Sequence, residues 1–323
     1  MIVRRDASPL ARTTAAFVGI AVVCLFFADI AITTVDPWTE FGRMLKGIVT
    51  PDFYATESLW LAMAYTLAFA LLGVGVANMV GFLLALLFHS RIVRVGCAFV
   101  RAIHELFWAL IFLQLFGLSP LTGVLAIAVP YAGIIAKVYA EILEEADPSP
   151  MRALPAGVGR ASAFFYARLP DVWAHFRTYS MYRLECGMRS SAVLGFIGLP
   201  TMGFHLESAF KEGQYSQASA LLILFYVIIA TMRLWIRRPL LPFYLAGAAL
   251  ILPWGVAFSL ANIVRFLTQD IVPHPLRVGG GDTLAAMGEW LSRLLFDQAL
   301  PGTLATIQLT MIALVATGFL TMI

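Results

Sequence analysis

The chain has 323 residues, of which 60% are hydrophobic and only 13% are charged, and its mean hydropathy is +0.85. A soluble domain is roughly half apolar and about a quarter charged, so this composition excludes a disordered chain, a nucleic-acid binder and a water-soluble enzyme. The net charge of +3 is too small to grip a polyanion. The three cysteines are scattered, and no CxxC or Cys/His cluster predicts a disulfide framework or a zinc site. The composition predicts an all-α, polytopic membrane protein.

Charge-poor runs in chain order predict about eight membrane spans, because a helix needs about 20 apolar residues to cross a bilayer. The run 106–136 is too long for one helix, and Gly117-Leu118-Ser119-Pro120 predicts a tight turn that divides it in two. The predicted spans cover residues 13–35, 59–88, the two halves of 106–136, 172–197, 213–232, 239–264 and 298–323.

The distribution of basic residues predicts which way the spans run. If the N-terminus is cytoplasmic, 13 of the 22 lysines and arginines fall in cytoplasmic segments and six fall in outer segments. An excess of Lys and Arg on the cytoplasmic side is the usual rule for membrane proteins, so a cytoplasmic N-terminus is favoured. The start, Arg4-Arg5 before an apolar run, resembles a secretory signal. Asp29 lies inside that run and no small-residue cleavage site follows, so we expect an uncleaved first span.

One predicted cytoplasmic segment, residues 141–175, is too long for a helix hairpin and too polar to span a membrane. Asp147-Pro148-Ser149-Pro150 is typical of a helix start, and Gly157 and Gly159 then break the helix. A second short helix is expected over 161–168, ending at Leu169-Pro170. Composition alone favours an interfacial linker for this segment.

The spacing within the segment favours a different interpretation. Ala153 is followed by three residues and then Gly157; nine residues later comes a group that ends in Leu169-Pro170. This spacing resembles the coupling loop of ABC importer permeases, with the pattern Glu-Ala-Ala, three residues, Gly, nine residues, Ile-x-Leu-Pro. The Glu, the second Ala and the Ile of that pattern are replaced here by Met151, Arg152 and Ala167.

Flanking stretches sharpen the resemblance. Residues 101–118 and 179–198 are similar to phosphonate-type (PhnE-like) permeases, and the resemblance covers about residues 57–238. In that family the next loop is usually Gly-rich, whereas this chain has Leu-Pro-Thr-Met-Gly at 199–203. The resemblance therefore indicates the fold more strongly than it indicates the substrate.

The resemblance implies a type I ABC importer transmembrane domain, a MetI-like helical bundle, in a bacterial inner membrane. It implies a permease rather than an enzyme, with no catalytic residues and no directly bound cofactor. A separate cytoplasmic ATPase dimer would bind ATP beneath the loop, since this chain has no GxxxxGK[ST] motif. A periplasmic substrate-binding protein and a second permease unit, as a homodimer or a fused repeat, are the other implied partners. The implied substrate is a small phosphorus oxyanion, a phosphonate or phosphite, moved inward by alternating access.

Among the charged residues in or beside the predicted spans, four are candidates for a translocation path or for structural ion pairs, namely Glu105, Arg183, Glu185 and Arg189. Charges at this depth usually face a bundle interior or a cavity. One interpretation puts Arg183 or Arg189 near an oxyanion pathway. The other, which we favour at this stage, is a set of structural ion pairs, because Glu185 and Arg189 are four residues apart and can pair on one helix face. The histidines show no metal-ligand spacing, so no metal site is expected.

The chain is expected to divide into three parts: an N-terminal span with an outer segment (1–56), a core permease unit (57–238) and a further segment (239–323). Residues 282–296 weakly resemble 36–50 at an offset of 246, so the last segment is interpreted as the start of a second, truncated permease unit. Two alternatives stay open. The chain could be an ABC permease for another small solute, or a secondary transporter or channel in which the loop is an ordinary linker.

Overall fold

The computed structural model describes residues 9–28, 36–155, 157–255, 259–278 and 283–322. Within these ranges all regular structure is helical and no strand occurs, which confirms the predicted all-α class. The chain divides into two compact units. The larger unit is Trp38–Phe266, and the smaller unit combines Met1–Pro37 with Leu267–Ile323.

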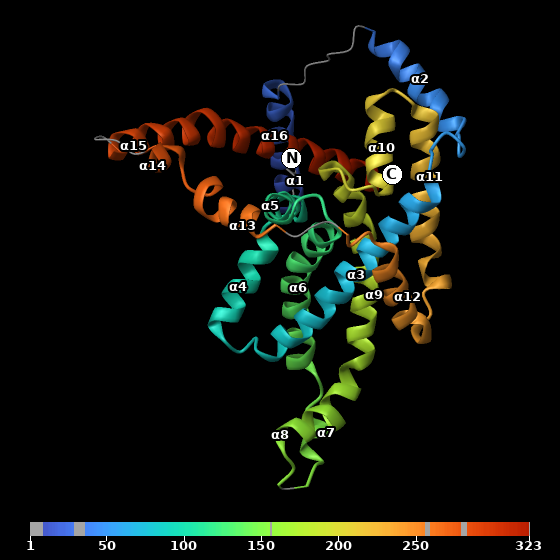
Figure 1. Cartoon of the computed structure of the whole chain (residues 1–323), viewed down its shortest axis with the longest axis vertical. Coiled ribbons are helices and arrows are strands. Elements are labelled where there is room, and N and C mark those ends of the chain that lie inside the picture. Colours follow the sequence, from blue (N-terminus) through green and yellow to red (C-terminus); the bar gives the residue numbers. More distant parts are fainter. Residues whose placement is uncertain (1–8, 29–35, 156, 256–258, 279–282, 323) are drawn as a thin grey trace, which may run out of the picture. The chain divides into compact units, whose positions relative to one another are not determined.

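The centre of the larger unit is a pair of long helices, α3 (Leu59–Leu86) and α6 (Pro120–Glu145), which pack against each other (Figure 1). Small residues allow their close approach. A Cβ atom on Gly73 would lie only 2.8 Å from the Cβ of Ile127. In lipid, helices associate through this kind of tight packing, because lipid tails remove the hydrophobic drive between them.

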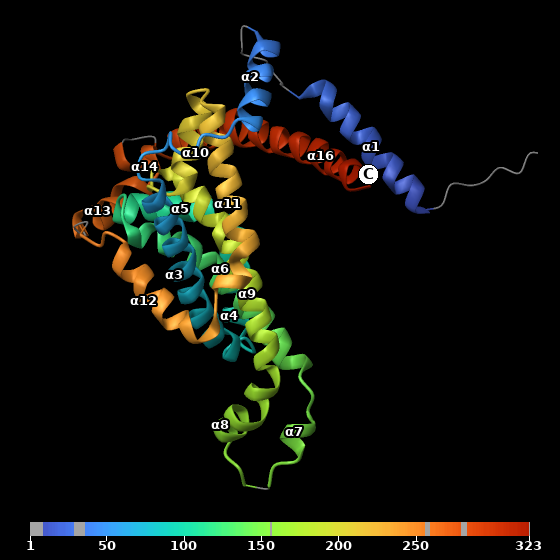
Figure 2. The same cartoon turned by 90° about the vertical axis from the view of Figure 1, so that its right-hand side faces the viewer.

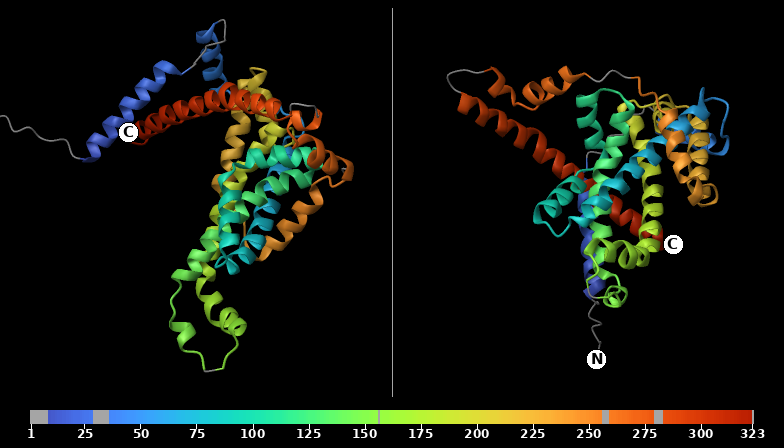
Figure 3. Two further views of the ribbon diagram at one scale, coloured as in Figure 1. Left: turned by 90° about the vertical axis from the view of Figure 1, so that its left-hand side faces the viewer. Right: turned by 60° about the horizontal axis from the view of Figure 1, so that its bottom comes forward.

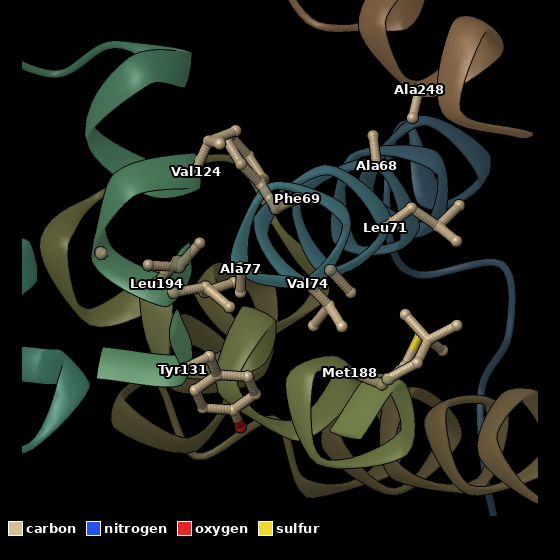
Figure 4. Packing of buried hydrophobic residues seen from close by; sticks show 14 of the residues in the cluster. Ala68, Phe69, Leu71, Val74, Ala77, Val124, Tyr131, Met188, Leu194 and Ala248 are labelled. Atoms are coloured by element: carbon tan, nitrogen blue, oxygen red, sulfur yellow. The ribbon is translucent and has the colours of Figure 1, made fainter. Parts of the chain in front are cut away.

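The buried core of the larger unit adds α9 (Leu169–Val193) to this pair. Figure 4 shows Phe69 of α3 beside Val124 of α6, and Val74 of α3 facing Met188 of α9. Phe69 and Met188 are at most 1% exposed. The three helices therefore form the scaffold on which polar side chains of the membrane region are held.

A bent pair of helices lies between α3 and α6 in the chain. α4 (Arg91–Ala102) and α5 (Glu105–Phe116) meet at 94°, so they form a broken span or a re-entrant loop. The predicted tight turn after α5 is confirmed. Gly117 has a φ of 69°, a region that favours glycine, and the Ser119 hydroxyl accepts a hydrogen bond from the Thr122 N–H at 3.4 Å.

The rest of the larger unit consists of α2 (Pro37–Val49), η2 (Leu194–Ile197), α10 (Met202–Lys211), α11 (Tyr215–Trp235), η3 (Arg238–Leu240), α12 (Leu241–Ile251) and α13 (Leu260–Arg265), and η4 (Phe266–Asp270) crosses its boundary. The amphipathic α2 contacts the start of α11. Ser219 donates to the Gly47 carbonyl oxygen at 2.7 Å, and Tyr215 donates to Glu40 Oε2 at 3.1 Å. α12 packs against α3.

The smaller unit holds α1 (Pro9–Phe27), α14 (His274–Val278), α15 (Thr283–Arg293), η5 (Leu294–Ala299) and α16 (Leu300–Met322). The last three are continuous and form a helix of 39 residues over Thr283–Thr321, which is the long red helix in Figure 3. Within this unit α1 packs along α16.

In the described residues, four helices are long and apolar enough to cross a membrane, namely α3, α6, α11 and Thr283–Thr321, and the bent pair would make a fifth. The chain is thus a multi-pass membrane protein, but the eight predicted spans are not all found. The expected span 172–197 is helical, over most of α9 and η2, yet it carries four charged residues. The expected span 239–264 is broken after α12, because Pro253 disfavours helix at Leu252. The helix α1 is short, and residues 29–35 lie outside the described ranges.

Candidate functional site: the projecting loop and the polar cluster on α9

A projecting loop, residues 146–168, joins α6 to α9 and extends beyond the other helices of the larger unit (Figure 2). It contains the expected short helices, α7 (Ser149–Arg152) and α8 (Arg160–Ala163), followed by the π-helical turn η1 (Phe164–Arg168). At its base, the Nε of Arg168 donates to the carbonyl oxygen of Leu143 at 3.1 Å, and the Nη2 of Arg168 donates to the same oxygen. The base of the loop is therefore closed by one side chain.

The start of α7 is held by Asp147, as the sequence predicts. Its Oδ1 accepts hydrogen bonds from the backbone N–H of Ser149 at 2.9 Å and from the Ser149 hydroxyl at 2.6 Å. Both bonds favour the ionised carboxylate, the hydroxyl bond most, so they lower the pKa of Asp147 below its ordinary value of 3.8. At neutral pH the carboxylate is therefore ionised and can accept both hydrogen bonds.

The turn between the two loop helices requires a glycine at one position and not at the other. Gly157 has a φ of +99°, a conformation that strains any other residue, whereas Gly159 has a φ of −62° and a ψ of 143°. A Cβ atom at either position would meet no atom within 4 Å. Ala153, the C-cap residue that follows α7, is exposed as well. The predicted sharp turn is present, and no described residue covers the positions of Gly157 and Gly159.

The predicted helix end at Leu169-Pro170 is wrong. The backbone is helical at Ala163 (φ −59°, ψ −42°) and still helical at Leu169 (φ −63°, ψ −42°), so α8, η1 and α9 form one continuous helix from Arg160 to Val193. The N–H of Leu169 bonds to the carbonyl of Phe164, five residues back. This widened turn accommodates Pro170, which would otherwise kink or end an ordinary helix.

Glu105 lies at the bend between α4 and α5 and connects three helices. Its Oε1 accepts a hydrogen bond from Ser190 Oγ on α9 at 2.7 Å, and the hydroxyl of Tyr131 on α6 lies 2.9 Å from the same Ser190 Oγ. Because Ser190 gives its one proton to Glu105, Tyr131 must donate to Ser190. The Nε2 of His104 is 3.9 Å from Glu105 Oε1. The carboxylate thus stabilises the packing of α5, α6 and α9.

Arg183 on α9 is surrounded by aromatic rings. Its Cζ lies 5.1 Å from the ring centre of Tyr179, 5.3 Å from that of Tyr182 and 5.8 Å from that of Tyr131. Its Nε donates to the Tyr179 hydroxyl at 2.7 Å. Among the described residues no carboxylate lies within 4.0 Å of this guanidinium.

Two other cations in or beside the predicted spans, Arg189 and Lys137, have carboxylate partners. Arg189 Nη2 lies 3.1 Å from Glu185 Oε1, the pair expected from their spacing, and Lys137 lies 2.8 Å from Glu141 Oε1. Glu185 and Arg189 also line an open cavity of about 650 Å³ between α9 and α11. Of the four charges that the sequence singles out, the structure pairs Glu185 with Arg189, bonds Glu105 to Ser190 and leaves Arg183 among tyrosines.

A second polar group connects α3, α6 and α9. The Oδ1 of Asn78 accepts from the Tyr139 hydroxyl at 2.7 Å and from Ser180 Oγ at 2.9 Å. Sequence reasoning did not single out Tyr139, Ser180, Tyr131 or Ser190, since hydroxyl groups are common in helices and their partners are distant in the chain. Among the described residues no group of three His, Cys, Asp or Glu side chains could hold a metal ion.

Known proteins similar to this chain are transport permeases, although no family model matches it. The phosphate-import permease protein PhnE of Mycolicibacterium smegmatis is 31% identical over 220 residues, 64% of this chain and 41% of that protein. The phosphite transport system permease protein PtxC of Stutzerimonas stutzeri is 25% identical over 223 residues, 65% of this chain and 81% of that protein. The cryptic phosphonate transport system permease protein PhnE2 of Escherichia coli is 31% identical over 107 residues, 33% of this chain and 88% of that protein.

Among solved structures, an amino acid ABC transporter crystallised with histidines has a TM-score of 0.47 and 16% identity, covering 66% of this chain and 99% of that chain. The chain spans less than half the length of the M. smegmatis relative.

Several apolar helices make this chain a multi-pass membrane protein, and the proteins similar to it are transport permeases. The chain belongs to the phosphonate and phosphite permeases of ABC transport systems. The similarity to the E. coli family member covers most of the length of that protein. The resemblance to phosphonate-type permeases is thereby confirmed.

Proposed function

We propose that this chain is the membrane-spanning permease subunit of an ABC importer, and that it carries a small phosphorus oxyanion, a phosphonate or phosphite, into the cytoplasm. The substrate class is supported by the names of its relatives, which transport phosphate, phosphite or phosphonate. The observation that carries the mechanism is the projecting loop, whose glycine turn has an unobstructed surface.

In this proposal a cytoplasmic ATPase dimer binds the projecting loop. The exposed face around Ala153 and Gly157 is the contact, because a glycine turn lets backbone approach a partner closely. Leu169 and Pro170 lie inside the long helix that leaves the loop, so their role is to pass movement into α9 rather than to mark its start. ATP is bound by the partner and not by this chain.

Movement of the loop has a rigid path to the membrane region. The helix from Arg160 to Val193 carries Ser180, Arg183 and Ser190, whose partners lie on α3, α5 and α6. A displacement at the loop would shift these contacts together, as rocking of packed helices does in alternating-access transporters. A periplasmic binding protein would deliver the substrate to this region. In this proposal the chain lies in a bacterial inner membrane with its N-terminus on the cytoplasmic side.

A second permease unit completes the pathway in this proposal, as a second copy or as a fused repeat. Residues 239–323 are proposed to begin such a repeat. In support, α2 (Pro37–Val49) and α15 (Thr283–Arg293) overlap at the offset of 246 residues that relates their sequences, and an apolar helix follows each of them.

The proposal is tested with two matched glycine variants, Gly157→Val and Gly159→Val. Both side chains enter open space, but only Gly157 needs a positive φ, so only its variant distorts the turn, at roughly 1–2 kcal/mol or more. Each protein is expressed with the candidate ATPase and binding protein, extracted in mild detergent, and assayed for ATPase retention and for ATP-dependent uptake of phosphite and methylphosphonate.

We expect Gly157→Val to lose both ATPase binding and uptake. Gly159→Val should keep the fold of the turn, and it should retain more ATPase binding and more uptake than Gly157→Val. Uptake that continues without ATP or in the presence of vanadate would instead favour a secondary transporter. ATP-dependent uptake of an unrelated solute would keep the ABC permease and replace its substrate.

A further inference from the structure

The guanidinium of Arg183 is a positive charge that the described part of the chain leaves without a carboxylate. Arg189 and Lys137, two other cations in or beside the predicted spans, each have a carboxylate within 3.1 Å or less. Charged groups in the membrane are costly and almost always face a bundle interior or a water-filled cavity, where they pair with an opposite charge. A cation in such a place that has no fixed carboxylate partner is suited to bind an anion transiently.

The surroundings of Arg183 hold its charge without neutralising it. Three tyrosine rings lie within 6 Å of its Cζ, an arrangement in which ring faces attract a cation. The Nε is bonded to Tyr179, whereas Nη1 and Nη2 donate to none of the described residues. Arg183 is half-buried, so these terminal N–H groups are not sealed in the core.

The geometry points to a fork-shaped binding group for an oxyanion. A guanidinium presents parallel N–H groups that match two oxygens of a phosphate-like anion, and such charge-assisted pairs are strong in a site with little water. Glu105 Oε1 accepts a hydrogen bond from Ser190, and this carboxylate lies more than 4.0 Å from the Arg183 guanidinium. Glu185 is likewise paired with Arg189. Neither carboxylate competes at close range for Arg183.

We propose that Arg183 binds the oxyanion of the substrate during its passage through the membrane, and that the tyrosines of α6 and α9 keep its guanidinium positioned for this contact. This inference rests on the proposed function, from which it takes the anion class. The same observations argue against Arg189 in that role, since its charge is satisfied within its own helix.

The closing experiment measures anion contact directly and transport separately. The permease is purified with its ATPase and binding protein in proteoliposomes and treated with phenylglyoxal, which modifies arginine side chains. Mass spectrometry follows the rate of modification at Arg183 and at Arg189, with phosphite, with methylphosphonate, and with sodium chloride at equal ionic strength. Uptake of phosphite and methylphosphonate is measured in parallel for wild type, Arg183→Gln, Arg183→Lys and the matched control Arg189→Gln.

We expect phosphite and methylphosphonate, but not chloride, to slow modification of Arg183 and to leave Arg189 unaffected. Uptake should fall about tenfold or more in Arg183→Gln, since a charge-assisted contact is lost. The Lys variant keeps the charge and loses the fork, so it should retain partial uptake with a higher half-saturating concentration. The control Arg189→Gln should stay within about twofold of wild type, because partly exposed ion pairs contribute little.

Each result decides one of the two proposals. If neither oxyanion protects Arg183, the contact is overturned whatever the uptake. If Arg183 is protected but Arg183→Gln transports like wild type, its role in passage is overturned. If Arg183 is protected while wild type takes up neither anion, the binding group stands and the proposed transport fails. If Arg183→Gln does not assemble with the ATPase, the role of Arg183 is decided by the uptake of Arg183→Lys and by the protection of Arg183 in the wild-type protein.

Discussion

Arg168 and Leu143 lie 25 residues apart in the chain and are joined by a hydrogen bond of 3.1 Å from the Arg168 Nε to the Leu143 carbonyl oxygen. Arg168 belongs to the π turn that precedes α9, and Leu143 belongs to the last turn of α6. The bond therefore closes the projecting loop at the point where it joins the membrane helices. A loop that is fixed at its base can pass a displacement to both helices.

Arg168→Met should loosen the loop without unfolding the helices. The carbonyl of Leu143 loses a charged donor, a change typically worth roughly 1.5–3 kcal/mol. We expect faster cleavage by chymotrypsin at the aromatic residues 164–166, and weaker coupling between ATP hydrolysis and uptake. The matched control is Arg160→Met, an exposed arginine in α8. Equal cleavage rates in the two variants would show that the base is not held by Arg168.

Gly73→Ala should destabilise the contact between α3 and α6. The added Cβ would lie 2.8 Å from Ile127 Cβ and 2.9 Å from its Cγ2, so the helices must separate or Ile127 must shift. Overpacking of this kind typically costs about 1–3 kcal/mol. Gly96→Ala on α4 is the control, because its Cβ meets nothing within 4 Å and alanine favours helix. Thermal unfolding in detergent should show a lower midpoint for Gly73→Ala and an equal or higher midpoint for Gly96→Ala.

Ser190→Ala should weaken the packing of α5 against α6 and α9. It leaves the partly buried Glu105 carboxylate without its 2.7 Å donor and Tyr131 without its acceptor. A buried group left unsatisfied costs roughly 1–3 kcal/mol. A double-mutant cycle of Ser190→Ala with Glu105→Gln measures the coupling, and we expect the two effects to be less than additive. Thr178→Ala, whose hydroxyl bonds only to its own helix at Ala174, should change stability little. Strict additivity would contradict the connection.

Asp147→Ala should open the start of α7, since the Ser149 N–H and hydroxyl lose their common acceptor. The folded pKa of Asp147 is lowered, so its stabilising effect is complete above the ordinary value of 3.8 and is lost only as pH falls through the folded pKa. Hydrogen exchange at residues 149–152, corrected for intrinsic rates, should therefore differ between wild type and Asp147→Ala by the same factor at pH 5 and pH 8. The difference should shrink only below pH 3.8, as the carboxylate is protonated, and a difference that already shrinks above pH 5 would show that the pKa is raised rather than lowered. Asp147→Asn retains an acceptor oxygen, so its hydrogen-exchange rate should lie between those of wild type and Asp147→Ala.

Local features of the chain could be predicted from its sequence because they depend on neighbouring residues. Apolar runs indicate α3, α6 and α11, since crossing a bilayer requires about 20 apolar residues whatever the partners. The turn at Gly117 and the turn at Gly157 follow from the backbone freedom of glycine, and both have a positive φ. The spacing of Ala153, Gly157, Leu169 and Pro170 indicated the permease family for the same reason, because it is a pattern within one loop.

The long-range contacts could not be predicted in this way. Ser190 meets Tyr131 and Glu105 at separations of 59 and 85 residues, and many other hydroxyls in the helices would have matched as well. Pro170 shows the same limit locally: it favours a helix end, yet a π turn just before it allows the helix to continue into α9. Whether an intramembrane charge is paired also depends on which helices pack together. Arg189 has a carboxylate one helical turn away, whereas the neighbours of Arg183 on α6 and α9 are tyrosines. Only the tertiary structure decides this difference, because a charged side chain in the membrane can interact only with the helices that pack around it.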